Sequence, residues 1–555
     1  MKKYLSAIRN KWRQHNNRLF LSDTNNNHVW YSQLTAFLLN LDNILQKMLK
    51  EERPSIIVVS DSLLMKIIAF MYAFITSIDL VLLSSKFSTI TIVNAIAFKH
   101  TSNVLIIDKE IEARIKIMEE EEGISVLKYF KYVDTTMGLI EKISPSMLNA
   151  EEALLNRLYR KGLRNAEDLL NEPAKLSVYS PGTTNAPCFT NIPYGILCKS
   201  MRAMSYSLGL NNGDNITVIA DFEFFPNVFT ILGFLNGLHF IQPVERITSA
   251  EDFTEQMSNS HYKPSIVVIT SHMFKLIWDS ILLHVYGRRL MFMLSKYPVL
   301  SLIPKYFVLK KVDKVFGKSA KKVHILNEEL GSYCLDILKK SKILFTSSYG
   351  YIEEGNFLAF KDPDLFKNKK YYSKPGGTVL KDSDEVFDKV YVEENTFTDC
   401  KIGGNYVGEV VVESVLDGKR RIMKSEDLAM EIPNVETQGS RKYLYIIGRK
   451  NRYPARIADM NFDLVEKSLK DSLLIRDCFM TKTIDKDHKD CYMLYVEPRE
   501  EIFDVLNINL EELKSAVELL IKELKDKSVN VVAYAIMRFD GMRNVAGKLQ
   551  YYTIT

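Results

Sequence analysis

The chain has 555 residues, 46% hydrophobic and 25% charged, as in ordinary globular proteins. This length is enough for about two or three folding units with a large buried core. The formal net charge of +5 is small for the length, and no basic stripe with interleaved aromatic residues is present, so no nucleic-acid partner is expected. The six cysteines form no C-x-x-C pair, which favours reduced thiols in a cytoplasmic protein over a zinc site or a disulfide framework.

The N-terminus begins Met1-Lys2-Lys3 and has no apolar run of signal-peptide length, so none is expected. The most hydrophobic segment covers residues 62–83. It contains Lys66 and Asp79, and its pattern favours a buried helix leading into a buried strand over a membrane span.

Helical and strand patterns alternate through residues 1–175 and again through residues 190–275. This alternation indicates parallel sheets covered by helices. The predicted helices span residues 31–50, 63–78, 197–208 and 228–236, and the predicted strands span residues 55–59, 80–83, 103–108, 215–220 and 265–270.

Between these two regions, an apolar strand at 176–179 breaks into a turn that contains Gly182, Thr183 and Thr184. Such a turn exposes successive backbone N–H groups and two hydroxyls, which suit phosphate oxygens. The same residue types also gather in ordinary surface turns, so the local chemistry leaves both interpretations open.

Residues 278–317 form a long aromatic and basic stretch. A set of amphipathic surface helices is one interpretation, and a surface for lipid bilayers or fatty substrates is the other. The second interpretation would give the protein a peripheral membrane contact. The basic residues of the stretch are Arg288, Arg289, Lys296, Lys305, Lys310, Lys311 and Lys314.

The last hundred residues form a compact α+β pattern. An apolar stripe flanked by Glu511, Glu512, Lys514 and Lys522 marks its strongest helix. The predicted helices of this part span residues 462–472 and 510–524, and the predicted strands span residues 492–496 and 530–535.

The order of residues in the turn, Tyr-Ser-Pro-Gly-Thr-Thr-Asn-Ala-Pro from Tyr179 to Pro187, resembles the Y-T-S-G-T-T-G-x-P-K-G loop of the adenylate-forming superfamily. That family includes acyl-CoA synthetases, peptide-synthetase adenylation domains and luciferases. Four more segments follow in the family's order, and a motif gains weight when its context agrees. They are Tyr349-Gly350-Tyr351-Ile352-Glu353, Met423-Lys424-Ser425-Glu426-Asp427, Gly448-Arg449 and Gly547-Lys548.

The resemblance implies an α/β fold with a large N-terminal AMP-binding domain over residues 1–450. This domain would contain two α/β subdomains and a β-barrel-like subdomain. A small mobile α+β domain would cover residues 451–555, with Asn451 at the hinge. The run 308–317 is similar to a segment of long-chain acyl-CoA synthetases, which leans toward fatty acyl substrates and fatty acid metabolism.

The resemblance also assigns roles to individual residues. Lys548 and Glu353 would be catalytic, with Lys548 between the substrate carboxylate and the α-phosphate and Glu353 on Mg²⁺. Asp427 would accept hydrogen bonds from the ribose hydroxyls, and Arg449 would contact ribose and phosphate. Gly182, Thr183, Thr184 and Tyr349 complete the ATP-binding set.

The implied activity is that of an acid–thiol ligase. A hydrophobic or fatty carboxylic acid would react with ATP to give an acyl-adenylate. The acyl group would then pass to the pantetheine thiol of CoA or of an acyl carrier protein. The aromatic stretch over residues 221–225 and 229–240 would form an apolar pocket wall, unless its side chains are plain core.

Several positions depart from the family pattern, and they motivate two alternatives. Cys188 replaces the loop lysine and Ile352 a threonine, and each of these two losses costs on the order of 1–3 kcal/mol. Glu426 replaces the glycine before Asp427. One alternative is a catalytically weakened protein that binds nucleotide or acyl group within an assembly. The other is amino-acid adenylation, with Asp221 or Glu223 pairing the ammonium. Further departures are Asn185, Phe189 and the run Leu326-Asn327-Glu328.

Overall fold

A computed structural model gives the fold of the chain. All statements below about structure refer to the residues that it describes. These are residues 6, 8, 10–11, 14–15, 17–25, 27–48, 55–98, 104–123, 125–134, 157–162, 174–180, 188–220, 226–243, 247–317, 320–326, 330–351, 357–367, 376–379, 389–393, 401–402, 405–416, 419–435, 441–449, 472–484, 490–507, 509–526 and 531–539.

The first sheet has six strands in the order β6-β5-β3-β4-β7-β8. Its neighbours are parallel except β7 and β8, which run antiparallel. Its strands are β3 (Ser55–Val59), β4 (Asp79–Leu83), β5 (Val104–Ile107), β6 (Lys131–Asp134), β7 (Lys175–Ser180) and β8 (Cys188–Pro193). The accompanying helices are α2 (Tyr31–Met48), α3 (Leu63–Thr76), α4 (Thr89–Phe98), α5 (Lys109–Glu122) and the 3₁₀ helix η1 (Leu127–Tyr129).

A second, larger sheet begins with parallel strands in the order β10, β9, β11, β12 and β13. The N-terminal strand β1 joins it beside β10, and β2 closes that edge. These strands are β1 (Leu19–Asp23), β2 (His28–Trp30), β9 (Asn215–Ile219), β10 (His239–Gln242), β11 (Ile266–Thr270), β12 (Lys322–Leu326) and β13 (Leu344–Tyr349). Its helices are α8 (Tyr194–Leu208), α9 (Pro226–Asn236), α10 (Ala250–Asn259), α11 (Ser271–Tyr286), α12 (Arg289–Ser295), α13 (Leu302–Gly317) and α14 (Ser332–Leu338).

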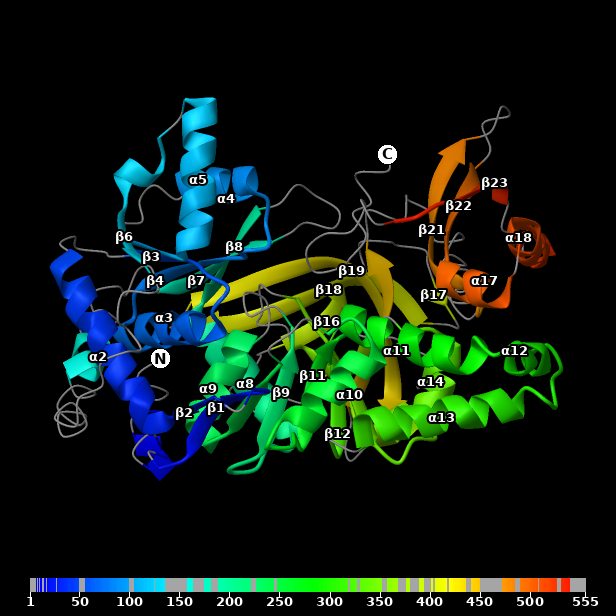
Figure 1. Ribbon diagram of the computed structural model, residues 1–555, viewed down its shortest axis with the longest axis horizontal. Helices are drawn as coiled ribbons and strands as arrows, with labels where there is room; N and C mark the ends of the chain where they lie inside the picture. Colours follow the sequence, from blue (N-terminus) through cyan, green and yellow to red (C-terminus); the bar gives the residue numbers. More distant parts are fainter. Residues whose placement is uncertain are drawn as a thin grey trace.

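The predicted barrel-like part continues this second sheet without a break. From β13 the hydrogen bonding passes through β14, β15, β20, β19 and β18 to β16, and all of these pairs are antiparallel. The long strands β18 and β19 cross the middle of the molecule (Figure 1). The elements are β14 (Ala359–Lys361), α15 (Pro363–Lys367), β15 (Gly376–Val379), β16 (Lys389–Glu393), β17 (Lys401–Ile402), β18 (Asn405–Leu416), β19 (Lys419–Val435) and β20 (Arg441–Arg449).

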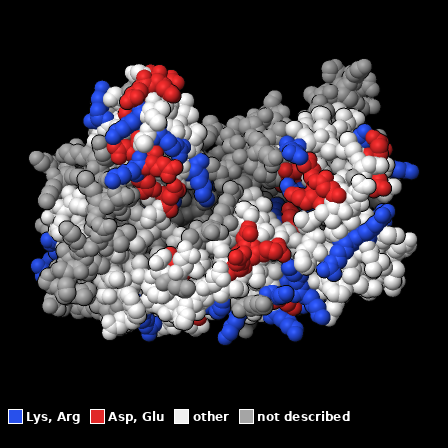
Figure 2. All heavy atoms as spheres, viewed as in Figure 1, with Lys and Arg blue, Asp and Glu red and all other residues white. Residues whose placement is uncertain are grey.

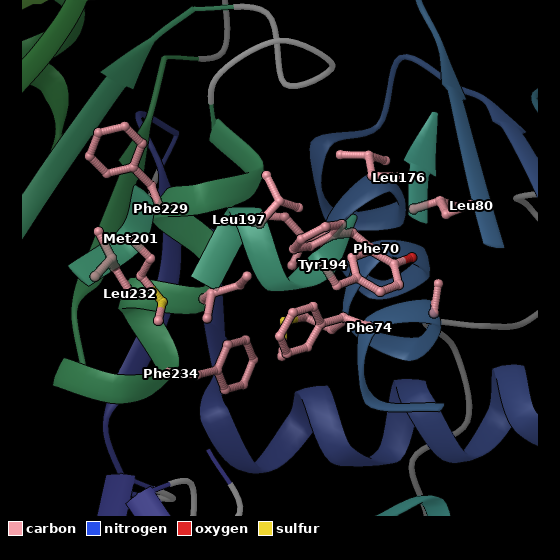
Figure 3. Close-up of a cluster of buried hydrophobic side chains, with 14 of the residues drawn as sticks. Phe70, Phe74, Leu80, Leu176, Tyr194, Leu197, Met201, Phe229, Leu232 and Phe234 are labelled. Atoms are coloured by element: carbon pink, nitrogen blue, oxygen red, sulfur yellow. The ribbon is translucent and has the colours of Figure 1, made fainter. Parts of the chain in front are cut away.

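The hydrophobic segment over residues 62–83 is the buried helix and strand that its pattern predicted. Every residue of α3 from Met65 to Thr76 is buried. Its Phe70 and Phe74 contact Tyr194 of α8 edge to face, and the same cluster takes in Phe229 and Phe234 of α9 (Figure 3). Since fully burying one such ring contributes about 2–3 kcal/mol, α3 joins the first and second sheets into one core. No helix in the described part of the chain is both long and apolar enough to cross a membrane.

The C-terminal part is a three-stranded sheet, β21-β22-β23, with two helices. It lies near α11 and α12 in Figure 1. The elements are β21 (Ile475–Ile484), β22 (Asp490–Pro498), α17 (Glu500–Leu506), α18 (Leu510–Asp526) and β23 (Val531–Ile536). The predicted helix at 462–472 and the predicted domain boundary at 450/451 lie outside the described residues, apart from Ser472.

Two kinds of contact attach this C-terminal unit to the rest. Apolar side chains of β18 to β20, such as Leu428 and Ile447, share one buried cluster with β21, β22 and α18. At the other contact, the buried guanidinium of Arg499 donates to Asp279 of α11 at 3.0 Å and to the carbonyl oxygens of Ser472 and Leu473. A buried, multiply bonded arginine fixes orientation more firmly than an exposed ion pair.

The cysteines agree with the predicted absence of a disulfide framework as far as they are described. Cys198, Cys334, Cys478 and Cys491 are buried and form no disulfide. Burial raises the pKa of Cys198 to about 12, so this thiol is protonated and unreactive at neutral pH.

Candidate nucleotide-binding site

Two of the predicted motifs meet at a single hydrogen bond. Tyr349 is the last residue of β13, and Asp427 lies within β19. The Tyr349 hydroxyl donates to Asp427 Oδ2 at 2.6 Å across 78 residues of sequence. Both side chains are largely removed from solvent, with Asp427 8% exposed. The predicted site residues Tyr349 and Asp427 are therefore neighbours.

The Tyr349 phenol is a neutral donor at every physiological pH. Burial, and then the charge of Asp427 beside it, raise the pKa of Tyr349 well above its ordinary value, while a hydrogen bond with Ser425 acts the other way. A carboxylate offers about four lone-pair acceptor sites, so the Tyr349 bond and the hydroxyls of a sugar diol can be accommodated together.

A distorted step in β19 orients Asp427. Glu426 has a φ of +58°, the left-handed conformation that costs a side-chain-bearing residue roughly 1–2 kcal/mol. Its N–H donates to Glu409 Oε1 at 2.9 Å, and the Asp427 N–H donates to Ser425 Oγ at 3.0 Å. The pairing of β18 with β19 shifts register at this point. A bulge of this kind redirects the side chain that follows it.

The conformation of Glu426 shows that replacing the family's glycine has not altered the backbone at this position. Glu426 stands where the family has glycine, and the backbone nevertheless adopts the glycine-like conformation. The other two described non-glycine residues with positive φ, Ser77 and Asn507, end helices α3 and α17. Glu426 is alone among the three in lying within a strand, and the buried Glu409 carboxylate binds the N–H exposed by the twist.

The Gly-Arg motif lies directly beside this step. Arg449 is the cross-strand partner of Asp427, and Gly448 pairs with Leu428. Gly448 has a φ of +151°, a value that only glycine adopts without strain. The backbone of Arg449 is thus placed next to Asp427, while its side chain lies outside the description.

The phosphate-loop motif is described only at its two ends. Ser180 and Cys188 are antiparallel partners at the ends of β7 and β8. Phe189, which replaces a motif glycine, packs its ring against that of Tyr179 at 4.9 Å, and both rings lie against the cluster beneath α4 and α5. Phe189 is therefore a partly buried side chain that packs against the core. Gly182, Thr183 and Thr184 lie outside the described residues, as do Glu353 and Lys548.

No group of three or more His, Cys, Asp or Glu side chains suited to a metal ion occurs in the part of the chain that the structure describes. The predicted magnesium ligand Glu353 is not in that part, so the magnesium site stays a prediction. The predicted pocket wall differs from the structure where it is described: Phe229 and Phe234 lie in the core, and residues 221–225 are outside the description.

Sequence reasoning missed the residues that support this site. His324 of β12 is fully buried, with Nδ1 3.0 Å from Thr346 Oγ1 and Nε2 3.1 Å from Ser348 Oγ, next to Tyr349. Burial, and then the charge of Lys322, lower the pKa of His324 to about 3, so the ring is neutral. Glu409 was missed too. For His324 the available signal was an imidazole between the apolar residues Val323 and Ile325, whereas Glu409 gave no distinct signal, since β18 also contains Glu413.

No protein-family model matches the sequence, and no curated protein matches it. Solved structures match over almost the whole chain. The anthranilate CoA ligase AuaEII in complex with anthranoyl-AMP has a TM-score of 0.70 at 12% identity and covers 99% of this chain and 96% of its own.

Two further structures show the same likeness. The O-succinylbenzoate CoA synthetase MenE from Bacillus subtilis, with ATP and magnesium, has a TM-score of 0.64 at 13% identity and covers 98% of both chains. The McyG A-PCP structure with phenylalanyl-adenylate has a TM-score of 0.65 at 13% identity and covers 99% of this chain and 94% of its own. The chain therefore has the adenylate-forming enzyme fold over nearly its whole length, as the order of its motifs predicted.

Proposed function

We propose that the protein activates a hydrophobic carboxylic acid with ATP and transfers the acyl group to a pantetheine thiol of CoA or an acyl carrier protein. The observation that carries this proposal is the Tyr349–Asp427 hydrogen bond with Arg449 as cross-strand neighbour. Parts of three motifs meet there, which supports a common role for them in binding one ligand. Shared fold alone would not support an activity.

In the first half-reaction, a carboxylate oxygen of the acid attacks the α-phosphorus of ATP, and pyrophosphate leaves. Asp427 would hold the ribose hydroxyls, and Arg449 would contact ribose and phosphate. Thr183, Thr184 and the backbone at Gly182 would hold the β- and γ-phosphates. Lys548 would offset the repulsion between carboxylate and phosphate.

The magnesium ion would be held by Glu353 and would neutralise phosphate charge. In the second half-reaction, the thiol sulfur attacks the acyl carbon, and AMP leaves with the electron pair of the broken bond. Because one site serves two different transition states, Lys548 would withdraw between them. The domain over residues 451–555 would carry it, turning about Asn451.

The acid is proposed to be hydrophobic, with aromatic and fatty acids as the classes to test. The compared structures contain an anthranoyl-adenylate and a phenylalanyl-adenylate, and MenE is an O-succinylbenzoate CoA synthetase. These are aromatic acyl groups. The fatty-acid prediction depends on the run 308–317 and on an aromatic stretch whose Phe229 and Phe234 lie in the core.

A catalytically weakened relative that binds nucleotide within an assembly is the second candidate. Its support is Cys188 in place of the loop lysine and Ile352 in place of a threonine. Glu426 no longer adds to it, because the glycine-like conformation is retained at that position.

The deciding experiment is acid-dependent exchange of radiolabelled pyrophosphate into ATP, measured with a panel of aryl and fatty acids. We expect exchange with at least one acid, and a loss of about 100-fold or more in the Lys548→Ala variant. Lys514→Ala is the matched control, since Lys514 lies in the same C-terminal part and forms an exposed pair with Glu511. Measurable ATP binding without exchange for any acid would favour the weakened relative and overturn the ligase proposal.

A further inference from the structure

A large exposed apolar surface covers helix α12, the connection after it and the start of α13. Of the twenty exposed large apolar side chains in the described chain, nine lie between residues 290 and 307. Val299 is 78% exposed and Leu302 61% exposed. We call this set the 290–307 surface. Single exposed apolar residues are ordinary, but a contiguous set of this size marks an interaction site.

Helix α12 does not contribute to the core. Its seven residues read Arg-Leu-Met-Phe-Met-Leu-Ser, and none of them is buried. A helix this apolar gains stability by burying a face, but its neighbours α11 and α13 leave all seven of its residues at least partly exposed. The helix lies at the outer end of the molecule (Figure 1).

Helix α13 carries apolar residues on its exposed face as well as on its buried face. Its buried residues are Pro304, Val308, Val312, Val315 and Phe316, which recur at helical spacing and form the core face. The opposite face of its first turns carries Ile303, Tyr306 and Phe307, which are exposed. A surface helix normally places polar residues on that face.

The charged residues within the stretch that forms the 290–307 surface are almost all positive. Residues 288–314 contain seven Lys and Arg residues but a single acid, Asp313, whose carboxylate accepts a hydrogen bond from Ser341. Lys296 and Lys310 lie over the rings of Phe292 and Tyr306, at 5.1 and 4.8 Å from the ring centroids. Basic atoms border uncharged surface at this end of the molecule (Figure 2).

We propose that the 290–307 surface binds the interface of an anionic phospholipid bilayer. Apolar and aromatic side chains would enter the boundary between headgroups and acyl chains, while the basic side chains meet the lipid phosphates. Long Lys and Arg side chains and Tyr suit this geometry, because each has an apolar body and a polar end. The contact lies in the plane of the interface.

The charge pattern selects a bilayer over a second copy of the chain. In a symmetric dimer built on this surface, each basic rim would meet the same rim of the other copy, and like charges facing one another oppose association. An anionic bilayer satisfies both the apolar area and the charge. This inference does not depend on the proposed activity, since lipid binding is measured without ATP or acid.

The test is flotation of the full-length protein with vesicles of phosphatidylcholine alone or mixed with phosphatidylglycerol. We expect binding to the anionic vesicles that weakens as salt is raised, and little binding to the neutral ones. The double variant Val299→Glu, Leu302→Glu should lower the vesicle partition coefficient by about tenfold or more. The variant Arg288→Gln, Arg289→Gln should lower binding and reduce its salt dependence.

Ile117→Glu is the matched control. Ile117 is 57% exposed and lies on α5, at the other end of the molecule (Figure 1), so its substitution should leave vesicle binding unchanged. Since all the substituted side chains are exposed, circular dichroism should show unaltered folding. The proposal is overturned if the wild type fails to float with anionic vesicles or if the Val299→Glu, Leu302→Glu variant floats equally well. It is also overturned if sedimentation shows a dimer that this variant abolishes.

Discussion

The Tyr349 hydroxyl reaches Asp427 across two strands that are far apart in sequence, at 2.6 Å. The donor is neutral and the acceptor is the carboxylate proposed to hold ribose. Loss of this bond should therefore both destabilise the contact between β13 and β19 and leave the Asp427 carboxylate without a fixed orientation.

Replacing Tyr349 with Phe should remove a donor from the buried Asp427 carboxylate. We expect the free energy of unfolding to fall by about 1–3 kcal/mol and the ATP dissociation constant to rise about tenfold, because the carboxylate is no longer oriented. Urea denaturation and calorimetry measure the two quantities.

The control for this variant is Tyr286→Phe. The Tyr286 hydroxyl is bonded to that of Tyr333 at 2.5 Å, away from the candidate site. Its loss should lower stability and leave ATP affinity alone. Equal effects of both variants on ATP binding would contradict the proposal that Tyr349 orients Asp427 for ATP.

Replacing Glu426 with Gly or Ala should separate backbone strain from side-chain chemistry. At a φ of +58° glycine is unstrained, whereas alanine keeps the left-handed cost of about 1 kcal/mol or more. We therefore expect the Gly variant to be more stable than the Ala variant by about 1 kcal/mol, in urea denaturation. At an ordinary helical or strand position the order would be reversed, so an Ala variant of higher stability would show that the bulge is not formed.

Replacing Arg499 with Ala should loosen the attachment of the C-terminal unit. The substitution removes the Arg499 donor from Asp279 and from two carbonyl oxygens, while Arg476 Nε remains 3.7 Å from Asp279 Oδ2, so we expect a loss of about 1–3 kcal/mol. Limited trypsin digestion should release the C-terminal part faster. Arg538→Ala serves for comparison, because Arg538 and Glu500 form an exposed pair in the same unit, for which about 0–1 kcal/mol is typical. Indistinguishable digestion of the two variants would argue against an anchoring role for Arg499.

Acid should destabilise the protein partly through two buried histidines. Burial, and then the charge of a neighbouring group, lower the pKa of His324 to about 3 and that of His239 to about 4. Between these values and the ordinary pKa of 6.5, the unfolded chain binds protons that the folded chain does not. Stability then rises with pH, so it falls as pH drops below about 6.5, with a slope of up to about 1.4 kcal/mol per pH unit for each group.

The measurement for this prediction is the free energy of unfolding at a series of pH values from neutral to acid. A His324→Gln variant should lose less stability over that range than the wild type, since one proton-binding difference is removed. The carboxylates contribute equally to both proteins. Parallel pH profiles would show that His324 does not titrate as described.

The local pattern of apolar and polar residues was sufficient to predict many of the helices and strands. The predicted strand at 55–59 matches β3, the helix at 63–78 matches α3 to within two residues, and the helix at 510–524 matches α18 closely. These segments have strong periodicity or continuous apolar character, which local propensity and burial both favour. The pairing of β1 with β10 was not predictable in this way, because residues such as Leu21 and Phe240 are far apart in sequence.

Motif order singled out Tyr349 and Asp427, which the structure shows to be hydrogen-bonded, but it did not reveal the energetics of the backbone around Asp427. Comparing Glu426 with the glycine of the family pattern predicts a weakened nucleotide site. The structure instead shows the same backbone conformation, with Glu409 binding the twisted N–H. A cost of about 1–2 kcal/mol can be offset by one buried hydrogen bond from a distant strand, and no local pattern reveals that bond. The aromatic residues Phe229 and Phe234 show the converse case, in which side chains suited to a pocket are used for packing.

Helix α3, which is buried from Met65 to Thr76, has a consequence for biosynthesis. Its Phe70 and Phe74 pack on Tyr194, and its cluster includes residues of α9. During translation these partners leave the ribosome long after α3 does. The apolar side chains of α3 are therefore exposed to solvent in the nascent chain until then. Such an interval invites aggregation, and we expect the yield of native protein to depend on chaperones that shield residues 63–76 until residues 194–236 have emerged.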